Sequence, residues 1–452
     1  MQPNSNATSQ PVSRRSFLQT SAVASAAAIT TLRAPYVHAA NGEDFIVKIG
    51  LIGCGGRGTG ALMDCIGAAT KVIYPKTTYH TEDAADGAKA TNKNIQVIAL
   101  ADLFDNRMEN CVGNCKKVGY DIPKERQFLG FDAHQKLLAI PEINYVILAT
   151  PPHFRPAHLK AAVEAGKNVF MEKPAAVDVP GVRSVIASGE LAKQKGLAIV
   201  AGTQRRHSPN YVETIKRIHD GAVGDINYAK AYWNGGEIWV IDRIPGWSDV
   251  EWQIRNWNCF NWLSGDHVVE QHVHNLDVMN WVLGTHPIKA VSGLGGRQSR
   301  LGTRHGNIFD HFACEFEYPN GVTMFSQCRQ INHTHDNVSE FVSGTKGKSN
   351  CADEIVPHSG EAWRYGKKGF APYQIEHADL IASIRDGKPL NEAKQIAEST
   401  MTGILAREAC YSGQEITWDD AMKSTFVRGP KEVKFGPYEI EAVAKPGTYH
   451  FS

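Results

Sequence analysis

The stretch that decides the fold runs Phe45-Ile46-Val47-Lys48-Ile49-Gly50-Leu51-Ile52-Gly53-Cys54-Gly55-Gly56-Arg57-Gly58. The mainly apolar residues up to Ile52 predict a buried strand, and a helix is expected to begin near Thr59. The glycines between them follow the order G-x-G-x-x-G, which permits a tight turn and lets a diphosphate approach backbone amides at a helix N-terminus. This pattern predicts a dinucleotide-binding Rossmann domain, with the dinucleotide bound by Gly53, Gly55, Gly56, Arg57 and Gly58.

A second strand is predicted at Ile95–Ala101, and Asp102 follows it directly. A carboxylate in this place accepts hydrogen bonds from both hydroxyls of an adenosine ribose, which favours NAD, with NADP as the alternative. The interval from Gly53 to Asp102 exceeds the usual roughly 20 residues, because a polar stretch at 77–94 is inserted. The assignment of Asp102 therefore rests on its position at the end of a strand.

The alternation of strands and helices continues to residue 203 and then changes. Strands are predicted at Asn144–Ala149, Asn168–Met171 and Leu197–Gly202, and helices at Pro156–Ala165 and Val179–Gln194. Beyond Thr203, period-two alternation in Ile226–Trp233 and Phe312–Tyr318 predicts antiparallel strands, with helices near Glu270–Leu283 and Gln374–Ile384. We expect an α/β Rossmann domain over 45–203 and an α+β domain with a large, predominantly antiparallel sheet over 204–452.

Composition excludes several classes of partner. The 452 residues contain 48 Lys and Arg against 47 Asp and Glu, so no basic excess indicates binding to nucleic acid or to an anionic membrane surface. No apolar run after the N-terminal segment is long enough for a stable membrane span. A small neutral or weakly charged ligand is the expected partner.

The N-terminal segment resembles a twin-arginine export signal. It contains Ser13-Arg14-Arg15-Ser16-Phe17-Leu18, then an apolar run at Ala22–Ile29 and small residues at Val37–Ala40. The resemblance implies a signal over 1–39, whether cleaved or retained, and a periplasmic or other extracytoplasmic location. It also implies export of an already folded protein, which suits an enzyme that acquires its dinucleotide in the cytosol. The alternative is an ordinary N-terminus that contains two arginines.

The nine cysteines are scattered and form no paired CxxC motifs, so no structural zinc site is predicted. Cys111 and Cys115 are the one close pair, four residues apart on a predicted helix. We favour two core thiols there over a disulfide or a metal pair.

Five segments in fixed order resemble the Gfo/Idh/MocA family of oxidoreductases: Gly50–Gly55, Ala149–His153, Glu172–Pro174, Gly202–Arg206 and Glu270–Asp277. The resemblance covers nearly the whole chain after residue 39. It implies a dinucleotide fold followed by a sheet whose open face helps to bind substrate and often forms an oligomer interface. A sugar or cyclitol substrate and a homo-oligomer are therefore expected.

The resemblance also assigns residues beside the glycine loop. It implies that the cofactor is contacted by Thr150, Pro151, His153, Glu172 and Lys173. Lys173 corresponds to the family lysine that touches both cofactor and substrate, and Pro174 is expected to follow a cis peptide bond. An ammonium close to a substrate hydroxyl stabilises the charge that develops on its oxygen.

The segment from Glu270 to Asp277 resembles the family pattern of an acid followed four residues later by His. His274 is the predicted general base, and Glu270, where the family usually has Asp, is expected to orient it from the same helical face. Arg206, Trp257, His274 and Asp277 are the predicted substrate-binding residues. His267, Glu270 and His274 would also fit a metal site by spacing, but we predict no metal.

The predicted function is NAD(P)-dependent transfer of a hydride between a sugar or cyclitol hydroxyl and nicotinamide. One alternative is an NAD-dependent glycoside hydrolase or dehydratase that works by transient oxidation and elimination. A dinucleotide-loaded binding protein without turnover is the third hypothesis.

Overall fold

The structure is a computed structural model that describes residues 45–73 and 80–451. The predicted export signal at 1–39 lies outside the described residues. Within the described residues, no helix combines the length and the apolar character needed to cross a membrane.

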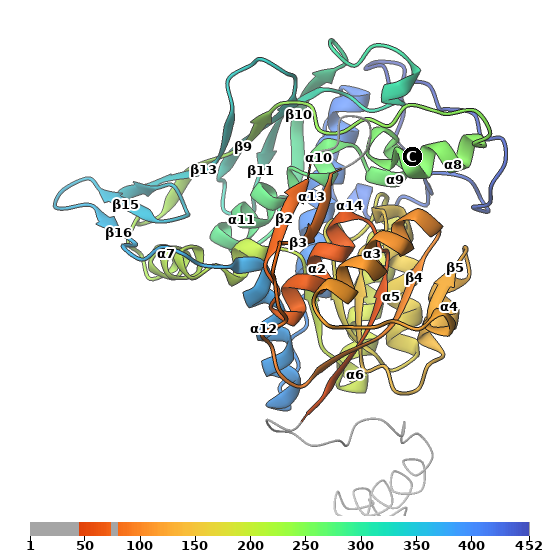
Figure 1. The fold of residues 1–452 in the computed structure, drawn as a ribbon. Helices are drawn as coiled ribbons and strands as arrows, with labels where there is room; N and C mark the ends of the chain where they lie inside the picture. Colours follow the sequence, from red (N-terminus) through yellow and green to blue (C-terminus); the bar gives the residue numbers. More distant parts are fainter. Residues whose placement is uncertain (1–44, 74–79, 452) are drawn as a thin grey trace, which may run out of the picture. The chain divides into compact units, whose positions relative to one another are not determined.

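A six-stranded sheet with the helices on its faces forms the first of two layer systems, the Rossmann part, and all its strands are parallel in the order β5-β4-β1-β6-β7-β8. Figure 1 shows this part in the lower half of the view, with β4 and β5 labelled. The strands are β1 (Val47–Ile52), β4 (Ile95–Asp102), β5 (Gln127–Leu129), β6 (Tyr145–Leu148), β7 (Asn168–Met171) and β8 (Ile199–Ala201). From β1 the chain adds β4 and β5 on one side, and it then crosses back and adds β6, β7 and β8 on the other side. This order is that of the Rossmann fold and confirms the predicted fold class.

Helices cover both faces of this sheet, so its strands are buried on two sides. They are α2 (Gly56–Ile66), α3 (Asp105–Lys117), α4 (Ala133–Leu138), α5 (Arg155–Glu164) and α6 (Val179–Lys195). Alternate residues of β7 show the division: Phe170 belongs to one hydrophobic cluster with residues of α2 and α3, and Met171 belongs to another with residues of α4, α5 and α6. The sheet therefore separates two cores.

The polar insertion that lengthens the interval between Gly53 and Asp102 contributes an antiparallel pair, β2 (Thr70–Ile73) and β3 (Thr81–Ala84). Residues 74–79 between them lie outside the described part. The pair packs on α2, which places the insertion beside the glycine loop.

A nine-stranded sheet forms the second layer system, in the order β16-β15-β14-β13-β9-β12-β11-β10-β17. Its strands are β9 (Ile226–Gly235), β10 (Lys289–Gly296), β11 (His311–Glu317), β12 (Thr323–Gln330), β13 (Asn337–Gly344), β14 (Gly347–Ser349), β15 (Glu354–Pro357), β16 (Trp363–Arg364) and β17 (Ile416–Thr417). The β9–β12 pairing is parallel and the other described pairings are antiparallel. The prediction of a large, predominantly antiparallel sheet is thereby confirmed.

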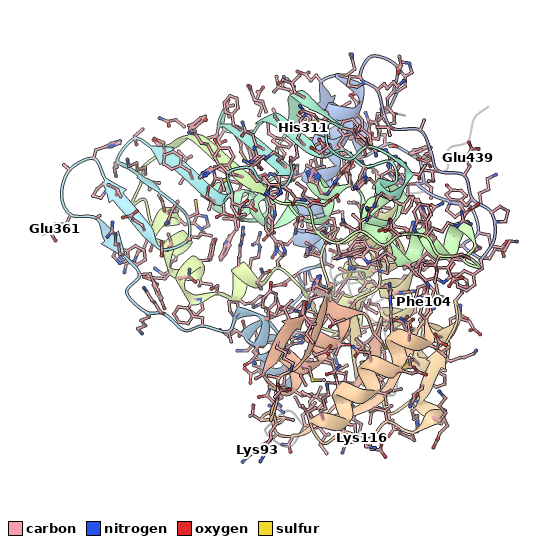
Figure 2. All side chains as sticks on the ribbon, turned by 45° about the horizontal axis from the view of Figure 1, so that its top comes forward. Lys93, Phe104, Lys116, His311, Glu361 and Glu439 are labelled. Carbon is pink, nitrogen blue, oxygen red and sulfur yellow. The ribbon has the colours of Figure 1, made fainter. Side chains whose placement is uncertain are left out.

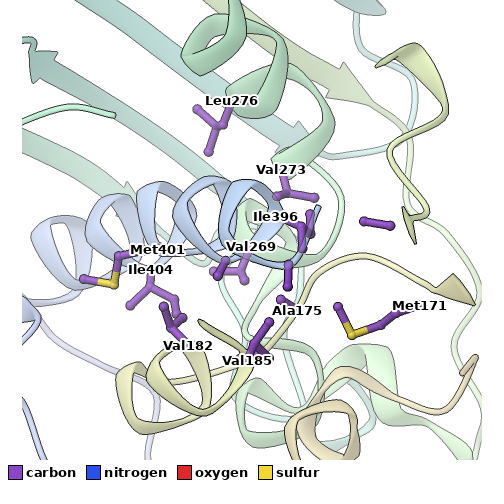
Figure 3. Close-up of a cluster of buried hydrophobic side chains, with 14 of the residues drawn as sticks. Met171, Ala175, Val182, Val185, Val269, Val273, Leu276, Ile396, Met401 and Ile404 are labelled. Atoms are coloured by element: carbon purple, nitrogen blue, oxygen red, sulfur yellow. The ribbon is translucent and has the colours of Figure 1, made fainter. Parts of the chain in front are cut away.

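The helix α13 (Ala393–Ser412) links the two layer systems. It packs on α6 of the Rossmann part and on α11 (Val273–Leu283) and β10 of the sheet part. Figure 3 shows the contact as a cluster of apolar side chains, with Val182 and Val185 facing Ile396, Met401 and Ile404. Because α13 is covered on nearly every side, its sequence is apolar or small around most of its circumference.

The helix predicted near Gln374–Ile384 is α12 (Pro372–Arg385), and it packs against α2 and β8. This late segment thus lies beside the Rossmann sheet, and the predicted boundary after residue 203 stays a prediction. The other α-helices of the described residues are α7 (Pro209–His219), α8 (Asp249–Arg255), α9 (Asn261–Ser264), α10 (His267–Glu270) and α14 (Trp418–Ala421).

Candidate active site

A cavity of about 840 Å³ is lined by residues from both layer systems. The Rossmann part contributes the glycine loop and the residues at the carboxyl ends of its strands, which is where open parallel sheets bind ligands. The other part contributes residues from β9, α8 and the segment that joins α10 to α11. Phe104, which lines the cavity and is labelled in Figure 2, lies between the helices of the Rossmann part and α8.

The glycine loop has the shape that a diphosphate requires. Gly55 lines the cavity as the N-cap of α2, and a Cβ atom there would enter open space, whereas a Cβ on Gly58 would lie 1.8 Å from the Gly53 oxygen. Gly53 has a φ of 101°, which favours glycine. No side chain caps the first turn of α2, so its amides face the cavity and fit an anionic group.

The Arg57 guanidinium forms ion pairs with carboxylates of the protein. It pairs with Asp64 at 2.7 Å, with Glu82 of β3 at 2.6 Å and with Glu172 at 2.9 Å. Burial by itself lowers the pKa of Arg57, but these carboxylates outweigh burial and raise the pKa above its ordinary value. Arg57 and Glu172 both line the cavity, but each is already neutralised by the other.

Asp102 lies at the end of β4 and lines the cavity, as predicted for the residue that binds the ribose. Its Oδ2 accepts a hydrogen bond from the Cys54 amide at 2.6 Å, and its Oδ1 accepts one from the Phe104 amide at 2.8 Å. Burial raises the pKa of Asp102, while Arg107 and the amide donors oppose the shift. Each carboxylate oxygen keeps a further lone pair for a ribose hydroxyl.

The loop after β6 brings only part of its predicted residues to the cavity. Thr150 and Pro151 line it, and the Thr150 hydroxyl is 3.2 Å from His158 Nδ1. His153 is not in the lining, because its ring packs edge-on against the indole of Trp262 at 5.0 Å between centroids. A role of His153 in cofactor binding finds no support in this geometry.

Lys173 is held in place by Glu270. The Lys173 Nζ donates hydrogen bonds to the Glu270 carbonyl at 2.8 Å and to Glu270 Oε1 at 2.7 Å. The peptide bond between Lys173 and Pro174 is cis, as the family resemblance implied. Arg155 donates to the carbonyls of both residues, at 2.8 and 2.7 Å, so the backbone of this segment is fixed from behind.

The helix predicted at Glu270–Leu283 is interrupted, and this changes the role of Glu270. It consists of α10, which ends at Glu270, and α11, which begins at Val273. The expected alignment of Glu270 and His274 on one helical face is therefore wrong. Among the described residues no hydrogen bond joins them, and the Glu270 carboxylate binds Lys173 instead. The periodicity continues across the break because both short helices bury their apolar side chains in the same core.

His274 lines the cavity and stacks on Trp233 of β9, with 5.7 Å between centroids and 24° between planes. Burial lowers the pKa of His274 well below its ordinary value, and the charges of Lys173 and Arg205 lower it further. The imidazole is therefore neutral near pH 7, so it can accept a proton.

The predicted substrate-binding residues separate into two groups. Trp257 lines the cavity with His274, beside Trp239 at 5.6 Å between centroids. Arg206 and Asp277 are absent from the lining; Arg206 Nε donates to Asp277 Oδ2 at 2.8 Å, and Asp277 is 1% exposed. Their prediction as substrate-binding residues is not supported, because each charge is already satisfied by the other.

Some residues of the lining had no role predicted from the sequence. Among them are Arg155, Trp233, Glu237, Gln271 and Tyr373. Gln271 lies inside the Glu270–Asp277 motif, so its position was a usable signal. Tyr373 comes from α12, 172 residues after the end of β8 at Ala201 (373 − 201), and no local pattern could place it there.

The described residues show whether metal-ligating side chains cluster and whether cysteines pair. Within 45–73 and 80–451 no three His, Cys, Asp or Glu side chains are arranged to hold a metal ion. The nine cysteines are all free and buried, so Cys111 and Cys115 are core thiols as predicted.

Comparison with known proteins gives two adjoining family matches. Residues 47–203 match the Gfo/Idh/MocA oxidoreductase family model of the NAD-binding Rossmann fold, and residues 211–349 match the C-terminal domain of the same family. The first match agrees with the open cradle at Gly55 and the carboxylate of Asp102, so the residues present fit NAD as the cofactor.

Individual relatives are similar over different lengths. The chain is 37% identical to inositol 2-dehydrogenase 1 of Saccharopolyspora erythraea over 83 residues, which cover 18% of this chain but only 24% of that protein. It is 24% identical to mouse trans-1,2-dihydrobenzene-1,2-diol dehydrogenase over 332 residues, covering 70% of this chain and 87% of the relative.

A solved structure agrees in fold. The aldose-aldose oxidoreductase of Caulobacter crescentus, solved with glycerol, superposes with a TM-score of 0.60 at 16% identity, covering 82% of this chain and 99% of that one. With this fold, the two consecutive family matches and the NAD-type cavity, the chain belongs to the Gfo/Idh/MocA family of oxidoreductases.

Proposed function

We propose that the protein catalyses the reversible, NAD-dependent oxidation of a hydroxyl group of a sugar or cyclitol. One observation carries the proposal: Lys173, Glu270 and His274 line the same cavity as Gly55 and Asp102. A proton acceptor, a cation and a loop suited to bind a dinucleotide therefore share one cavity. The dehydrogenase names of the relatives support the proposed substrate class.

His274 acts as the general base, since its neutral imidazole can accept the hydroxyl proton. Lys173 points an ammonium whose remaining N–H can donate to the substrate oxygen and stabilise the negative charge that develops there. Glu270 is a positioning residue, because both of its hydrogen bonds to Lys173 fix the ammonium. Bound NAD supplies the hydride acceptor.

The lining aromatic side chains suit the apolar face of a sugar ring. Trp233, which stacks on His274, lines the cavity, as do Trp239 and Trp257. Indole faces pack on the C–H face of a ring, and polar groups between them bind its hydroxyls. This arrangement supports a neutral polyhydroxylated substrate.

The proposal is tested by mass spectrometry and absorbance of the purified protein, before and after challenge with sugars, cyclitols and aryl glycosides. We expect bound NAD, and an absorbance rise from its reduction when a sugar or cyclitol is oxidised. Protein that contains no dinucleotide and binds none when NAD is added would refute the proposal. Full NAD occupancy with no response to any substrate would favour a binding protein.

A second candidate is cleavage of a glycoside or loss of water by transient oxidation followed by elimination. The observation that favours it is the presence of two proton acceptors in one cavity, Glu270 and His274, since elimination requires a second proton to be removed from carbon. Cleavage of an aryl glycoside with NAD unchanged overall would support this candidate over net oxidation.

The proposal includes export and self-association. The paired arginines Arg14 and Arg15 support export as a folded, NAD-loaded protein. The open face of the nine-stranded sheet supports a homo-oligomer, because Leu294 of β10 and Phe325 of β12 are 76% and 40% exposed there. Cell fractionation of the Arg14→Lys/Arg15→Lys variant tests export, and light scattering of the purified protein tests association.

A further inference from the structure

Gln271 lies in the break between α10 and α11, and it lines the cavity together with Glu270 and His274. Its Oε1 accepts a hydrogen bond from Gln330 Nε2, at the end of β12. Its own Nε2 has no partner among the described residues. With its oxygen turned toward Gln330, the Gln271 amide offers its unpaired NH₂ group, a donor, to the cavity.

The orientation of the Gln271 amide is set, through Gln330, by the buried Arg300. Arg300 is 2% exposed, and its guanidinium donates to the Gln330 Oε1 and, at 2.9 Å, to the Phe309 carbonyl. A guanidinium has donors and no acceptor, so Gln330 must turn its oxygen toward Arg300 and its NH₂ group toward Gln271. Gln271 must in turn offer its oxygen to Gln330. The direction of each hydrogen bond is therefore set by Arg300.

Gln330 has no freedom to reverse this order. Its side chain is 1% exposed, and its backbone amide donates to the Asp310 carbonyl at 2.9 Å. Asp310 Oδ2 accepts from the backbone amide of Arg300 at 3.1 Å, so the same loop fixes the arginine and the glutamine. A reversed Gln330 would place its NH₂ group against the guanidinium and leave two buried donors unsatisfied.

We propose that Gln271 donates a hydrogen bond to an oxygen atom of the substrate, and that Arg300 and Gln330 hold its amide in the orientation that allows this. Gln271 is thus a specificity-determining residue. It selects a sugar or cyclitol that carries an acceptor oxygen, such as a second hydroxyl, a ring oxygen or a carbonyl, beside the reacting hydroxyl. The inference rests on the proposed function for its substrate class.

The sharpest variant is Gln330→Glu, which leaves Gln271 itself unchanged. The new carboxylate would still accept from Arg300, but it would accept from Gln271 instead of donating to it, so Gln271 would turn its oxygen toward the cavity. We expect kcat/KM for the best sugar of the panel to fall about 10- to 100-fold. Gln271→Leu should show a loss of similar size, and the double variant should be no worse than Gln271→Leu, because both changes remove one interaction.

Gln194→Glu is the matched control, since Gln194 of α6 is exposed and takes no part in the hydrogen-bond relay from Arg300 through Gln330 to Gln271. It should retain wild-type kcat/KM. All variants should keep wild-type NAD content and unfolding temperature, which separates a lost substrate contact from a damaged fold. With a substrate analogue that lacks the acceptor oxygen, wild type and Gln271→Leu should become equal. Wild-type kcat/KM for Gln330→Glu, together with a loss for Gln271→Leu, would overturn the role of the relay.

A measurement without turnover distinguishes failure of the relay from failure of the proposed function. Neutron diffraction from crystals exchanged into D₂O locates the deuterons of each amide. We expect the ND₂ group of Gln271 to face the cavity and that of Gln330 to face Gln271. An oxygen of Gln271 facing the cavity would overturn the inference even if sugars are oxidised. If no sugar is oxidised, the proposed function fails and the amide orientation is still decided.

Discussion

Lys173 and Glu270 are both largely buried, and each supplies the charge that the other needs. An ion pair in such surroundings contributes little to stability by itself, because desolvation offsets much of the attraction. Its value in this site is geometric. The two hydrogen bonds to Glu270 fix the Lys173 ammonium at the cavity, and the proposed mechanism requires it there beside the substrate oxygen.

Substitution of Lys173 by Met should lower kcat by about 100-fold or more, because no cation then stabilises the charge on the substrate oxygen. Glu270→Gln should lower it less, since the Glu270 carbonyl still accepts from Lys173 Nζ at 2.8 Å. Steady-state kinetics with the sugar identified by the panel measures both. Equal losses for the two variants would show that Glu270 does more than position the lysine.

His274 gives the enzyme a pH dependence whose sign can be stated. Burial, Lys173 and Arg205 lower the pKa of His274, so the free base persists below pH 6.5, and kcat/KM should fall only in more acidic solution. Arg205→Gln removes one of the two cations, so the pKa should rise and the acid limb of the kcat/KM profile should move to higher pH. Arg205→Lys keeps the charge and should leave the limb nearly unchanged.

Arg205 also pairs with the buried Glu340, which confounds the single substitution. Arg205→Gln combined with Glu340→Gln removes both charges of the pair and should shift the limb in the same direction. A profile for the double variant that coincides with wild type would show that Arg205 does not act through its charge on His274.

At the scale of elements, the strand–turn–helix unit of β1 and α2 combines two different demands for glycine. Gly58 serves packing, since a Cβ atom there would overlap the Gly53 carbonyl oxygen, whereas the space beside Gly55 is open and fits the proposed approach of the dinucleotide. One motif therefore contains a residue whose substitution harms the fold and another whose substitution harms binding.

Gly55→Ala should leave the unfolding temperature nearly unchanged and weaken NAD binding by about tenfold or more, because the new methyl group occupies the approach of the diphosphate. Gly58→Ala should instead destabilise the protein by about 1–3 kcal/mol through overpacking. Gly113→Ala, in α3 and also open, is the control that should affect neither property adversely. Calorimetry with NAD and thermal unfolding separate these outcomes; unaltered NAD affinity in Gly55→Ala would contradict the assignment of the cradle.

At the scale of the molecule, the segment after α14 ties distant parts together without forming helices or strands. Arg428, 2% exposed, donates to Glu408 of α13 at 2.7 Å and to the Tyr449 hydroxyl at 2.6 Å, and its backbone amide donates to Asp178 at the start of α6 at 2.9 Å. Burial raises the pKa of Glu408, but Arg428 and Arg407 outweigh it and hold the pKa at about 2. The charge of Glu408 is therefore retained in the core.

Arg428→Met should destabilise the protein by about 3–5 kcal/mol, the usual cost of breaking a buried ion pair from one side. Because α13 contacts both layer systems, we expect one cooperative urea transition with a lower midpoint and an unchanged slope. Lys431→Ala, nearby and exposed, is the control. Two separate transitions in Arg428→Met would show that the Rossmann part and the nine-stranded-sheet part unfold independently once this ion pair is lost. That outcome would contradict a joint stabilisation of the two parts.

Local sequence was sufficient for much of this protein. The glycine order after β1, the Asp after β4 and the alternation of strands and helices identify a Rossmann fold, because steric and hydrogen-bonding demands there act over a few residues. The period-two segments likewise predict the strands of the large sheet. Family resemblance added Lys173, Glu270 and His274, all of which line the cavity.

Only the tertiary structure decided which partner each charged group takes. Sequence spacing allowed Glu270 to pair with His274, but the break at Gln271 and His272 turned it to Lys173. Arg206 and Asp277 lie in segments that resemble family motifs, but they form an ion pair with each other outside the cavity. Ion pairs and hydrogen-bond directions depend on distances between elements that are remote in sequence, so they follow from how the layers pack. The hydrogen bonds from Arg300 through Gln330 to Gln271 are an example.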